Sequence, residues 1–135
     1  MAVIFRTKAS LRIMSDELVP DEITKLLGAL PTFEQVRGEV LVGKNTGTKR
    51  EAKFGMWNLR AKVAEPGDLE GQIFEILNQL EMDIDVWNEI TNSHKANMFC
   101  GLFMRDSNEG FMLSPRALSA LGERKIELDL DIYDG

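Results

Sequence analysis

The residues that could do chemistry are few, and zinc of the usual structural kind is excluded first. The chain has one histidine, His94, and one cysteine, Cys100. These two side chains are too few to complete such a site. Asp106, Asn108 and Glu109 have a fragment of calcium-loop spacing, but the full EF-hand pattern is absent, so we interpret the segment as a turn. Carboxylates alone could still hold a cation, but we predict neither a metal nor any other cofactor.

Cys100 and His94 could in principle form a thiolate–imidazole pair for nucleophilic catalysis. Reactive cysteines usually lie in electropositive, partly exposed surroundings such as a helix N-terminus. Cys100 stands instead between Phe99 and Gly101, in the middle of an apolar run. We therefore expect a buried, inert thiol and predict no catalytic residue.

The segment 43–50, Gly-Lys-Asn-Thr-Gly-Thr-Lys-Arg, superficially resembles a phosphate-binding loop. Such a loop needs one more residue between its glycines, then Lys followed by Ser or Thr, and then a helix. Here the order is Thr-Lys and a strand is expected next. We interpret the segment as the loop of a β-hairpin.

The last predicted strand carries the alternating acids Glu127, Asp129 and Asp131. They could form an acid/base cluster, but we favour ion pairs across the sheet. The expected partners are Lys8 and Arg12 on the first strand, or Arg60 and Lys62 on the third. An acidic stripe can also keep an edge strand from pairing with other chains.

The middle third of the chain is basic and holds the candidate binding residues. Asn58, Arg60 and Lys62 alternate along the third predicted strand and share one exposed face. We assign binding of a partner or ligand to five residues: Asn58, Arg60, Lys62, Arg37 and Arg50. Such a cluster could hold an anionic small molecule or an acidic patch on a protein. Ordinary solvated surface charge is the alternative.

The partners expected of this chain exclude nucleic acid and membrane. Sixteen Lys and Arg against 22 Asp and Glu give a net charge of −6, which phosphate backbones and anionic lipids repel. We expect no aromatic side chain on the same face as the bases of the third strand, so an RNA-stacking sheet is not predicted. Trp57 is expected in the core.

Hydrophobic periodicity predicts the elements that position these residues. The expected elements are, in order, strand 7–14, helix 20–27, strand 39–42, strand 53–63, helix 69–80 with a shorter second piece around 84–90, strand 96–104, a helix from Pro115 and strand 125–133. A bulge at Gly55 is expected to restore the register of the third strand. Leu118 and Leu121 are expected to point inward from the last helix, and strand 96–104 is apolar on both faces.

This order, β-α-β-β-α-β-α-β, predicts an α+β fold. We expect a mixed, mostly antiparallel sheet with helices packed on one face, of a ferredoxin-like kind. Polar alternation on the first, third and last strands supports the prediction, because each then has one face in water. A chain of 135 residues predicts a single compact domain, 1–135.

Short motifs along almost the whole chain resemble the bacterial domain-of-unknown-function family 4279. The segments that carry the resemblance are Pro20-Asp21-Glu22-Ile23-Thr24 with Leu26-Leu27-Gly28, Pro31-Thr32 leading to Gly38-Glu39, Trp57-x-Leu59, Phe99-Cys100-Gly101-x-Phe103, Gly110-Phe111-x-Leu113-Ser114-Pro115 and Asp131-Ile132-Tyr133. They span about residues 7–133. The resemblance implies a small bacterial α+β domain and transfers no catalytic residue.

These observations predict a non-enzymatic protein-interaction or binding module of bacterial type. An immunity protein that neutralises a toxin is one concrete form, because an acidic surface speeds the encounter with a basic partner. A small-molecule sensor or ligand-binding domain is one alternative. The other is a carboxylate-dependent enzyme, with candidate residues at the loop ends: Asp16, Glu17, Asp106 and Glu109.

The N-terminal apolar run is too short for the core of a signal peptide, and no stretch approaches the ~20 apolar residues of a membrane span. A single cysteine cannot form an intrachain disulfide. We therefore expect a cytoplasmic protein. A homodimer is possible, because an antiparallel edge strand can pair with its own copy.

Overall fold

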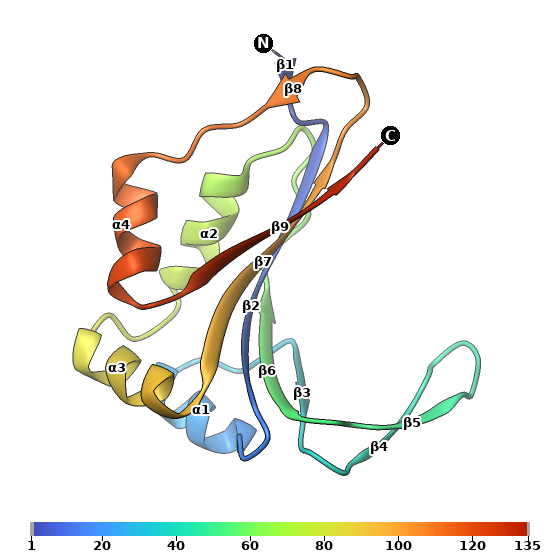
Figure 1. Cartoon of the computed structure of the whole chain (residues 1–135), viewed down its shortest axis with the longest axis vertical. Coiled ribbons are helices and arrows are strands. Elements are labelled where there is room, and N and C mark those ends of the chain that lie inside the picture. The colour runs from blue at the N-terminus through green and yellow to red at the C-terminus, as the bar shows by residue number, and fades with distance from the viewer. Residues whose placement is uncertain (1, 135) are drawn as a thin grey trace.

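A five-stranded mixed sheet forms one layer of the protein, and helices cover one of its faces (Figure 1). This computed structural model describes residues 2–134. The strand order is β3 (Phe33–Gln35), β6 (Gly55–Arg60), β2 (Arg6–Ser15), β7 (Lys95–Phe103) and β9 (Glu127–Tyr133). Strand β2 is antiparallel to both β6 and β7, whereas β9 runs parallel to β7. The predicted α+β class, the mixed and mostly antiparallel sheet and the ferredoxin-like layering are confirmed.

The helices begin and end where the sequence supplies caps. They are α1 (Pro20–Leu27), α2 (Leu69–Leu77), α3 (Ile84–Ser93) and α4 (Pro115–Glu123). Helix α1 stops at Gly28, whose φ of 78° is the left-handed conformation that favours glycine. The Asp68 side chain accepts a hydrogen bond from Gly71 N at the start of α2, and Ser114 accepts one from Ala117 N at the start of α4. None of the helices within residues 2–134 is long and apolar enough to cross a membrane.

The core lies between the sheet and the helices. Alternate residues of the central strands, such as Leu11, Trp57 and Met98, are fully buried there against α1 and α2. Trp57 is a core residue as predicted, and its indole N–H donates to the Thr24 hydroxyl at 3.0 Å. Because buried indole N–H groups need a partner, this bond fixes α1 against β6.

The inward face of α4 differs from the prediction. Ala117 and Leu121, one helical turn apart, are buried, whereas Leu118 is 53% exposed. Leu121 was predicted correctly and Leu118 was not. The spacing of Pro115, Leu118 and Leu121 fits a helix face, but the small Ala117 allows the closer approach to the core.

The segment between β3 and β6 forms a separate two-stranded arm. Strands β4 (Val40–Val42) and β5 (Lys49–Glu51) pair with each other and project on the side of the sheet away from the helices (Figure 1). The hairpin loop predicted at 43–50 is confirmed for 43–48, with Gly47 at φ 67°, but Lys49 and Arg50 already belong to β5. The edge strand β3, however, was not predicted, because a strand of three residues is too short to show alternation.

The bulge expected at Gly55 is absent, and the register of β2 with β6 is regular from Ser15↔Gly55 to Ser10↔Arg60. Gly55 is needed for another reason: a Cβ there would lie 2.7 Å from the Leu18 carbonyl oxygen. The structure does contain one extra residue of this kind, but beyond the other end of β6. The N–H of Ala61 bonds to Ala9 O, and the next pair is Ala64 with Thr7. The chain after β6 therefore advances by three residues while β2 advances by two, as in a β-bulge.

Candidate functional site

The face of the sheet away from the helices, here called the open face, is built from polar and aromatic side chains. The pairing of the strands sets them in rows across the sheet. One row contains Arg60, Ser10, Phe99 and Asp129, and the next contains Asn58, Arg12, Asn97 and Glu127. Because alternate residues of a strand share a face, these positions must face the same way.

A pocket of about 450 Å³ lies on this face between β2 and β6, and is called the open-face pocket below. Its polar lining is Lys8, Ser10, Arg12, Asn58 and Arg60, and Phe99 and Val63 add apolar surface. Ser10 is a short side chain between Lys8 and Arg12 on its own strand and beside Arg60 on the next. The small central residue within a ring of longer ones produces the hollow.

Asn58 is the unusual residue of the open-face pocket. It is only 7% exposed, and its Oδ1 has no hydrogen-bond partner among residues 2–134. Its amide nitrogen has only a long contact of 4.0 Å to the sulfur of Met56. An unpaired buried carbonyl costs about 1–3 kcal/mol, so a ligand that donates a hydrogen bond here would remove a real penalty.

Arg12 is a fixed cation in the wall of the pocket. Its Nε and Nη2 donate to Asn97 Oδ1 at 3.2 and 3.1 Å, and Nη2 lies 3.6 Å from Asp129 Oδ2. The guanidinium also stacks over the Phe99 ring, 4.3 Å from its centroid. These contacts on several sides hold the Arg12 guanidinium in one position, so it cannot reorient toward a ligand. The predicted ion pair between Asp129 and Arg12 is confirmed, whereas Glu127 pairs with Lys95 of β7 at 3.3 Å.

Lys8 and Arg60 are the available cations of the pocket. Within residues 2–134 neither forms an ion pair, and both are exposed. The Lys8 ammonium lies 5.4 Å from the centroid of the Phe103 ring, which leaves its charge accessible. With Arg12, three positive charges surround Ser10 and Asn58, and the carboxylate of Asp129 is already paired with Arg12.

The structure brings together only two of the five predicted binding residues, Asn58 and Arg60. Lys62 does not line the pocket, because the extra residue after β6 turns Val63 toward it instead. Arg37 lies on a loop and pairs with Asp16 at 3.5 Å. Arg50 lies on the arm, where its Nη2 is 3.5 Å from Gln35 Oε1.

The contribution of β2 to this site was not predicted from the sequence. Lys8 and Arg12 were predicted only as ion-pair partners of the last strand, and Ser10, which alternates with them, was assigned no role. The signal that could have found them is their alternation, which matches that of Asn58 and Arg60. When two neighbouring antiparallel strands both alternate polar and apolar residues, their polar side chains lie together on one face of the sheet.

The expectation that no aromatic ring shares a face with the bases is wrong. Phe99 and Phe103 of β7 lie on the open face, since the second face of this strand is not covered by a layer. The rings are nevertheless occupied: Arg12 covers Phe99, Arg6 covers Phe103, and Tyr133 stacks on Phe103 with centroids 4.7 Å apart. They are therefore not a free platform for stacking bases.

Cys100 and His94 do not form a pair. Burial raises the pKa of the Cys100 thiol to about 12, with a smaller contribution from Asp129, and the buried thiol predicted from the sequence is confirmed. The Nδ1 of His94 lies 2.6 Å from the Ser15 hydroxyl. Partial burial lowers the pKa of His94, while Glu22 and Glu17 act in the opposite direction.

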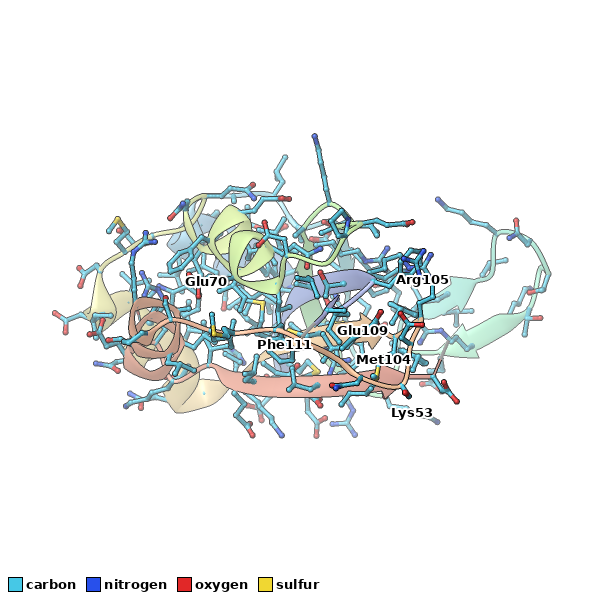
Figure 2. The ribbon with its side chains drawn as sticks, turned by 90° about the horizontal axis from the view of Figure 1, so that it is seen from above. Lys53, Glu70, Met104, Arg105, Glu109 and Phe111 are labelled. Atoms are coloured by element: carbon cyan, nitrogen blue, oxygen red, sulfur yellow. The ribbon has the colours of Figure 1, made fainter. Side chains whose placement is uncertain are left out.

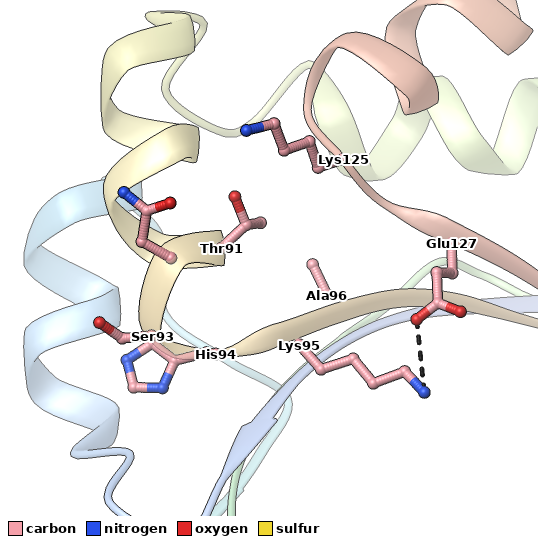
Figure 3. A pocket seen from close by; sticks show the side chains of 8 residues that line it. Thr91, Ser93, His94, Lys95, Ala96, Lys125 and Glu127 are labelled. Atoms are coloured by element: carbon pink, nitrogen blue, oxygen red, sulfur yellow. Dashed lines mark ion pairs between the residues drawn. The ribbon is translucent and has the colours of Figure 1, made fainter.

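A second pocket, of about 460 Å³, lies next to His94 at the end of α3 (Figure 3). Its charged side chains include Lys125 and the ion pair between Lys95 and Glu127. That pair already neutralises one lysine. No buried polar atom without a partner has been found in its lining, within residues 2–134, so it lacks the feature that distinguishes the open-face pocket.

The carboxylates proposed for an enzyme lie at opposite ends of the sheet. Asp16 follows the end of β2, whereas Asp106 follows the end of β7 that pairs with the start of β2. The length of β2 separates them by roughly 30 Å. Glu109 lies on β8 (Glu109–Gly110), which pairs with β1 (Ala2–Val3), and Figure 2 shows it near Arg105.

Glu109 has a structural role at that end of the molecule. Its Oε1 accepts hydrogen bonds from the backbone N–H groups of Phe5 and Arg105, at 3.2 and 2.9 Å. These bonds close the turn that leads into β8, which agrees with the interpretation of 106–109 as a turn. Across residues 2–134 no group of His, Cys, Asp and Glu side chains is arranged to hold a metal ion.

Comparison with known families gives one result. A family model described as "Domain of unknown function (DUF4279)" matches residues 5–135. No curated protein and no solved structure matches the chain.

Proposed function

Because the chain belongs to the DUF4279 family, whose description assigns no activity, we propose a function from the geometry: a non-enzymatic binding module that holds an anionic ligand in the open-face pocket. The observation that carries the proposal is the buried Asn58 amide, whose Oδ1 has no partner among residues 2–134. It lies in a pocket with two cations, Lys8 and Arg60, that are free of ion pairs within the same residues.

The chemistry of the lining defines the ligand class. Lys8 and Arg60 favour a carboxylate or phosphate group, since ionic hydrogen bonds are about twice as strong as neutral ones. Asn58 Oδ1 requires a hydroxyl, amine or amide donor on the same molecule. Val63 offers apolar contact to its remainder, since Arg12 already covers the Phe99 ring. A volume of about 450 Å³ is that of a small-molecule site.

A protein-interaction module, with a bacterial immunity protein as its concrete form, is the second candidate. The β4–β5 arm favours it, because Val40 and Val42 are 61% and 59% exposed on a hairpin that extends past the open face (Figure 1). Exposed apolar residues on a projecting element commonly contact partners. In this form an acidic side chain of the partner would enter the open-face pocket, and the buried, reduced Cys100 suits work in the cytoplasm.

Thermal unfolding with a panel of anions tests the leading proposal. The panel contains inorganic phosphate, succinate and aspartate, of which aspartate also supplies an amine donor. A ligand that binds only the folded chain raises Tm as its concentration passes Kd. We expect at least one anion to raise Tm of the native protein, and the increase to disappear in Arg60→Glu.

Lys62→Glu is the matched control for this experiment. It changes the net charge by the same amount and lies two residues from Arg60, but outside the pocket. We expect it to keep the anion response of the native protein. Equal loss in both variants would mean that overall charge, and not the pocket, is responsible, and no response to any anion would count against a small ligand. To examine the protein-partner form, the native protein and Arg60→Glu are compared in co-purification with a toxin encoded by a neighbouring gene.

A further inference from the structure

The outer edge of β9 offers unpaired backbone groups. Strand β9 ends the sheet order, and no strand within residues 2–134 pairs with its other side. The N–H of Met104 donates to Tyr133 O at 3.0 Å, so Tyr133 directs its carbonyl toward β7. Successive residues of a strand direct their backbone groups to opposite sides. The groups that point outward therefore belong to Leu128, Leu130 and Ile132.

The side chains of β9 form one apolar row and one acidic row. Leu128, Leu130 and Ile132 lie on the helix face, in register with the core residues of β7, yet Leu130 and Ile132 are 40% and 61% exposed. The acidic row on the open face consists of Glu127, Asp129 and Asp131. An incoming strand would thus meet an apolar row on one face, an acidic row on the other, and free backbone groups between them.

The acidic row remains able to contact an added base. Asp129 already pairs with Arg12 and Glu127 with Lys95, but the two carboxylate side chains are 48% and 62% exposed. Each carboxylate has lone pairs beyond those used by one cation. A lysine or arginine arriving from the outer side can therefore share them.

Charge identifies the chemistry of the strand that fits this edge. A second copy of β9, paired antiparallel, would set one acidic row opposite the other, and like charges directly opposite destabilise a strand pair. A strand with alternate basic residues would place them across from the acids, and its apolar residues would cover Leu130 and Ile132. We propose that the outer edge of β9 binds an extended segment of a partner protein in which basic and apolar residues alternate. This surface is separate from the open-face pocket.

Synthetic peptides test the proposal directly. The probe is a capped, fluorescently labelled peptide of alternating valine and lysine, as long as the seven residues of β9. The comparison peptide alternates valine and glutamate. By fluorescence anisotropy we expect the lysine peptide to bind at least about tenfold more tightly. In the double variant Asp129→Lys/Asp131→Lys this preference should reverse, and an unchanged preference would overturn the proposal.

N-methylated peptides test whether the backbone pairs. The valines of the bound peptide share a face with Leu128, Leu130 and Ile132, and the lysines share a face with the acids. In an antiparallel pair the outward groups of β9 bond to the residues directly opposite, which are the valines. In a parallel pair they bond to the residues on either side of those, which are the lysines. Methylation of one set should therefore abolish binding, while methylation of the other set leaves it within about twofold. Equal behaviour of the two methylated peptides would overturn the proposal. This measurement uses the native protein and does not depend on a variant that folds.

Two variants and a size measurement complete the test. Leu130→Pro removes one outward N–H and no bond to β7, so we expect it to lose the peptide. Arg60→Glu should bind the peptide normally, so a failure of the open-face pocket is distinguishable from a failure at this edge. A dimer detected by light scattering that the peptide dissociates would assign the edge to a second copy and contradict the proposal.

Discussion

At the scale of single residues, two asparagines in the same row of the sheet, on either side of Arg12, make a useful contrast. Asn97 is 5% exposed, accepts from Arg12 and donates to Asp129. Asn58 is 7% exposed, and its Oδ1 has no partner within residues 2–134. Buried amides are normally satisfied because desolvation without a hydrogen bond is costly. Asn97 links β2, β7 and β9, whereas the unpaired Asn58 oxygen is the basis on which we propose a binding role.

Replacing each asparagine with leucine should therefore have opposite effects on stability. Asn58→Leu removes an unsatisfied carbonyl and should raise the free energy of unfolding by about 1 kcal/mol, while it abolishes anion binding. Asn97→Leu leaves Arg12 and Asp129 without their shared partner and should lower it by about 1–2 kcal/mol. Urea denaturation measures both values. Destabilisation of Asn58→Leu by as much as Asn97→Leu would contradict a binding role for the Asn58 amide.

The buried Cys100 thiol predicts how stability changes at high pH. Its pKa in the folded protein is raised by burial to about 12, from an ordinary value of 9.0. The unfolded chain therefore loses the thiol proton first, so stability declines as pH rises above about 9. Urea denaturation between about pH 8 and pH 11 should show a steeper decline for the native protein than for Cys100→Ala. Parallel curves for the two proteins would contradict this prediction.

At the scale of elements, a buried polar network fixes the place where the chain leaves the sheet after β6. The Thr7 hydroxyl donates to Gln72 Oε1 of α2 at 2.7 Å. The Gln72 amide in turn donates to the carbonyls of Thr7 and Lys62 at 2.9 and 2.7 Å. Because Lys62 lies in the stretch that contains the extra residue, the network determines that Val63 and not Lys62 reaches the open-face pocket.

Gln72→Leu should show the strength of this network. The substitution removes three hydrogen bonds: Thr7 O keeps its bond from Ala64 N–H, the Thr7 hydroxyl loses its acceptor, and Lys62 O loses its Gln72 donor. It should lower the free energy of unfolding by about 2–3 kcal/mol. Gln79→Leu is the control, because Gln79 is exposed and its side chain, within residues 2–134, bonds only to the nearby Glu75 O. It should change stability by less than about 0.5 kcal/mol. Equal effects of the two substitutions in urea denaturation would contradict the argument.

Long periodic elements could be predicted from the sequence, and short or tertiary features could not. Helix α2 and strand β2 follow directly from spacing and capping residues, because each buries one face over several turns or pleats. Strand β3 has too few residues to alternate. The extra residue near Lys62 depends on bonds to Thr7 and α2, which are distant in sequence. The sequence predicts that Asn58 and Arg60 share one face of their strand. It does not show that β2 lies beside that strand, which depends on the strand order of the folded sheet.

At the scale of the whole molecule, charge is distributed unevenly although the net charge is −6. The open face carries cations on β2 and β6 and acids on β9, with helices covering the other face. A short-range field of this kind attracts a small anion to one side of the face and a base to the other, even though the chain as a whole is acidic. The two proposed binding surfaces, the open-face pocket and the β9 edge, thus carry charges of opposite sign.

Backbone NMR of the labelled protein, titrated with phosphate, succinate and aspartate, tests the central claim most directly. If an anion binds in the open-face pocket, saturable shifts should be largest at Ser10, Arg60 and the side-chain amide of Asn58, and small at the pocket beside His94. The same titration of Asn58→Leu should show no saturation. Shifts that stay linear for every anion, or that centre on His94, would contradict the account.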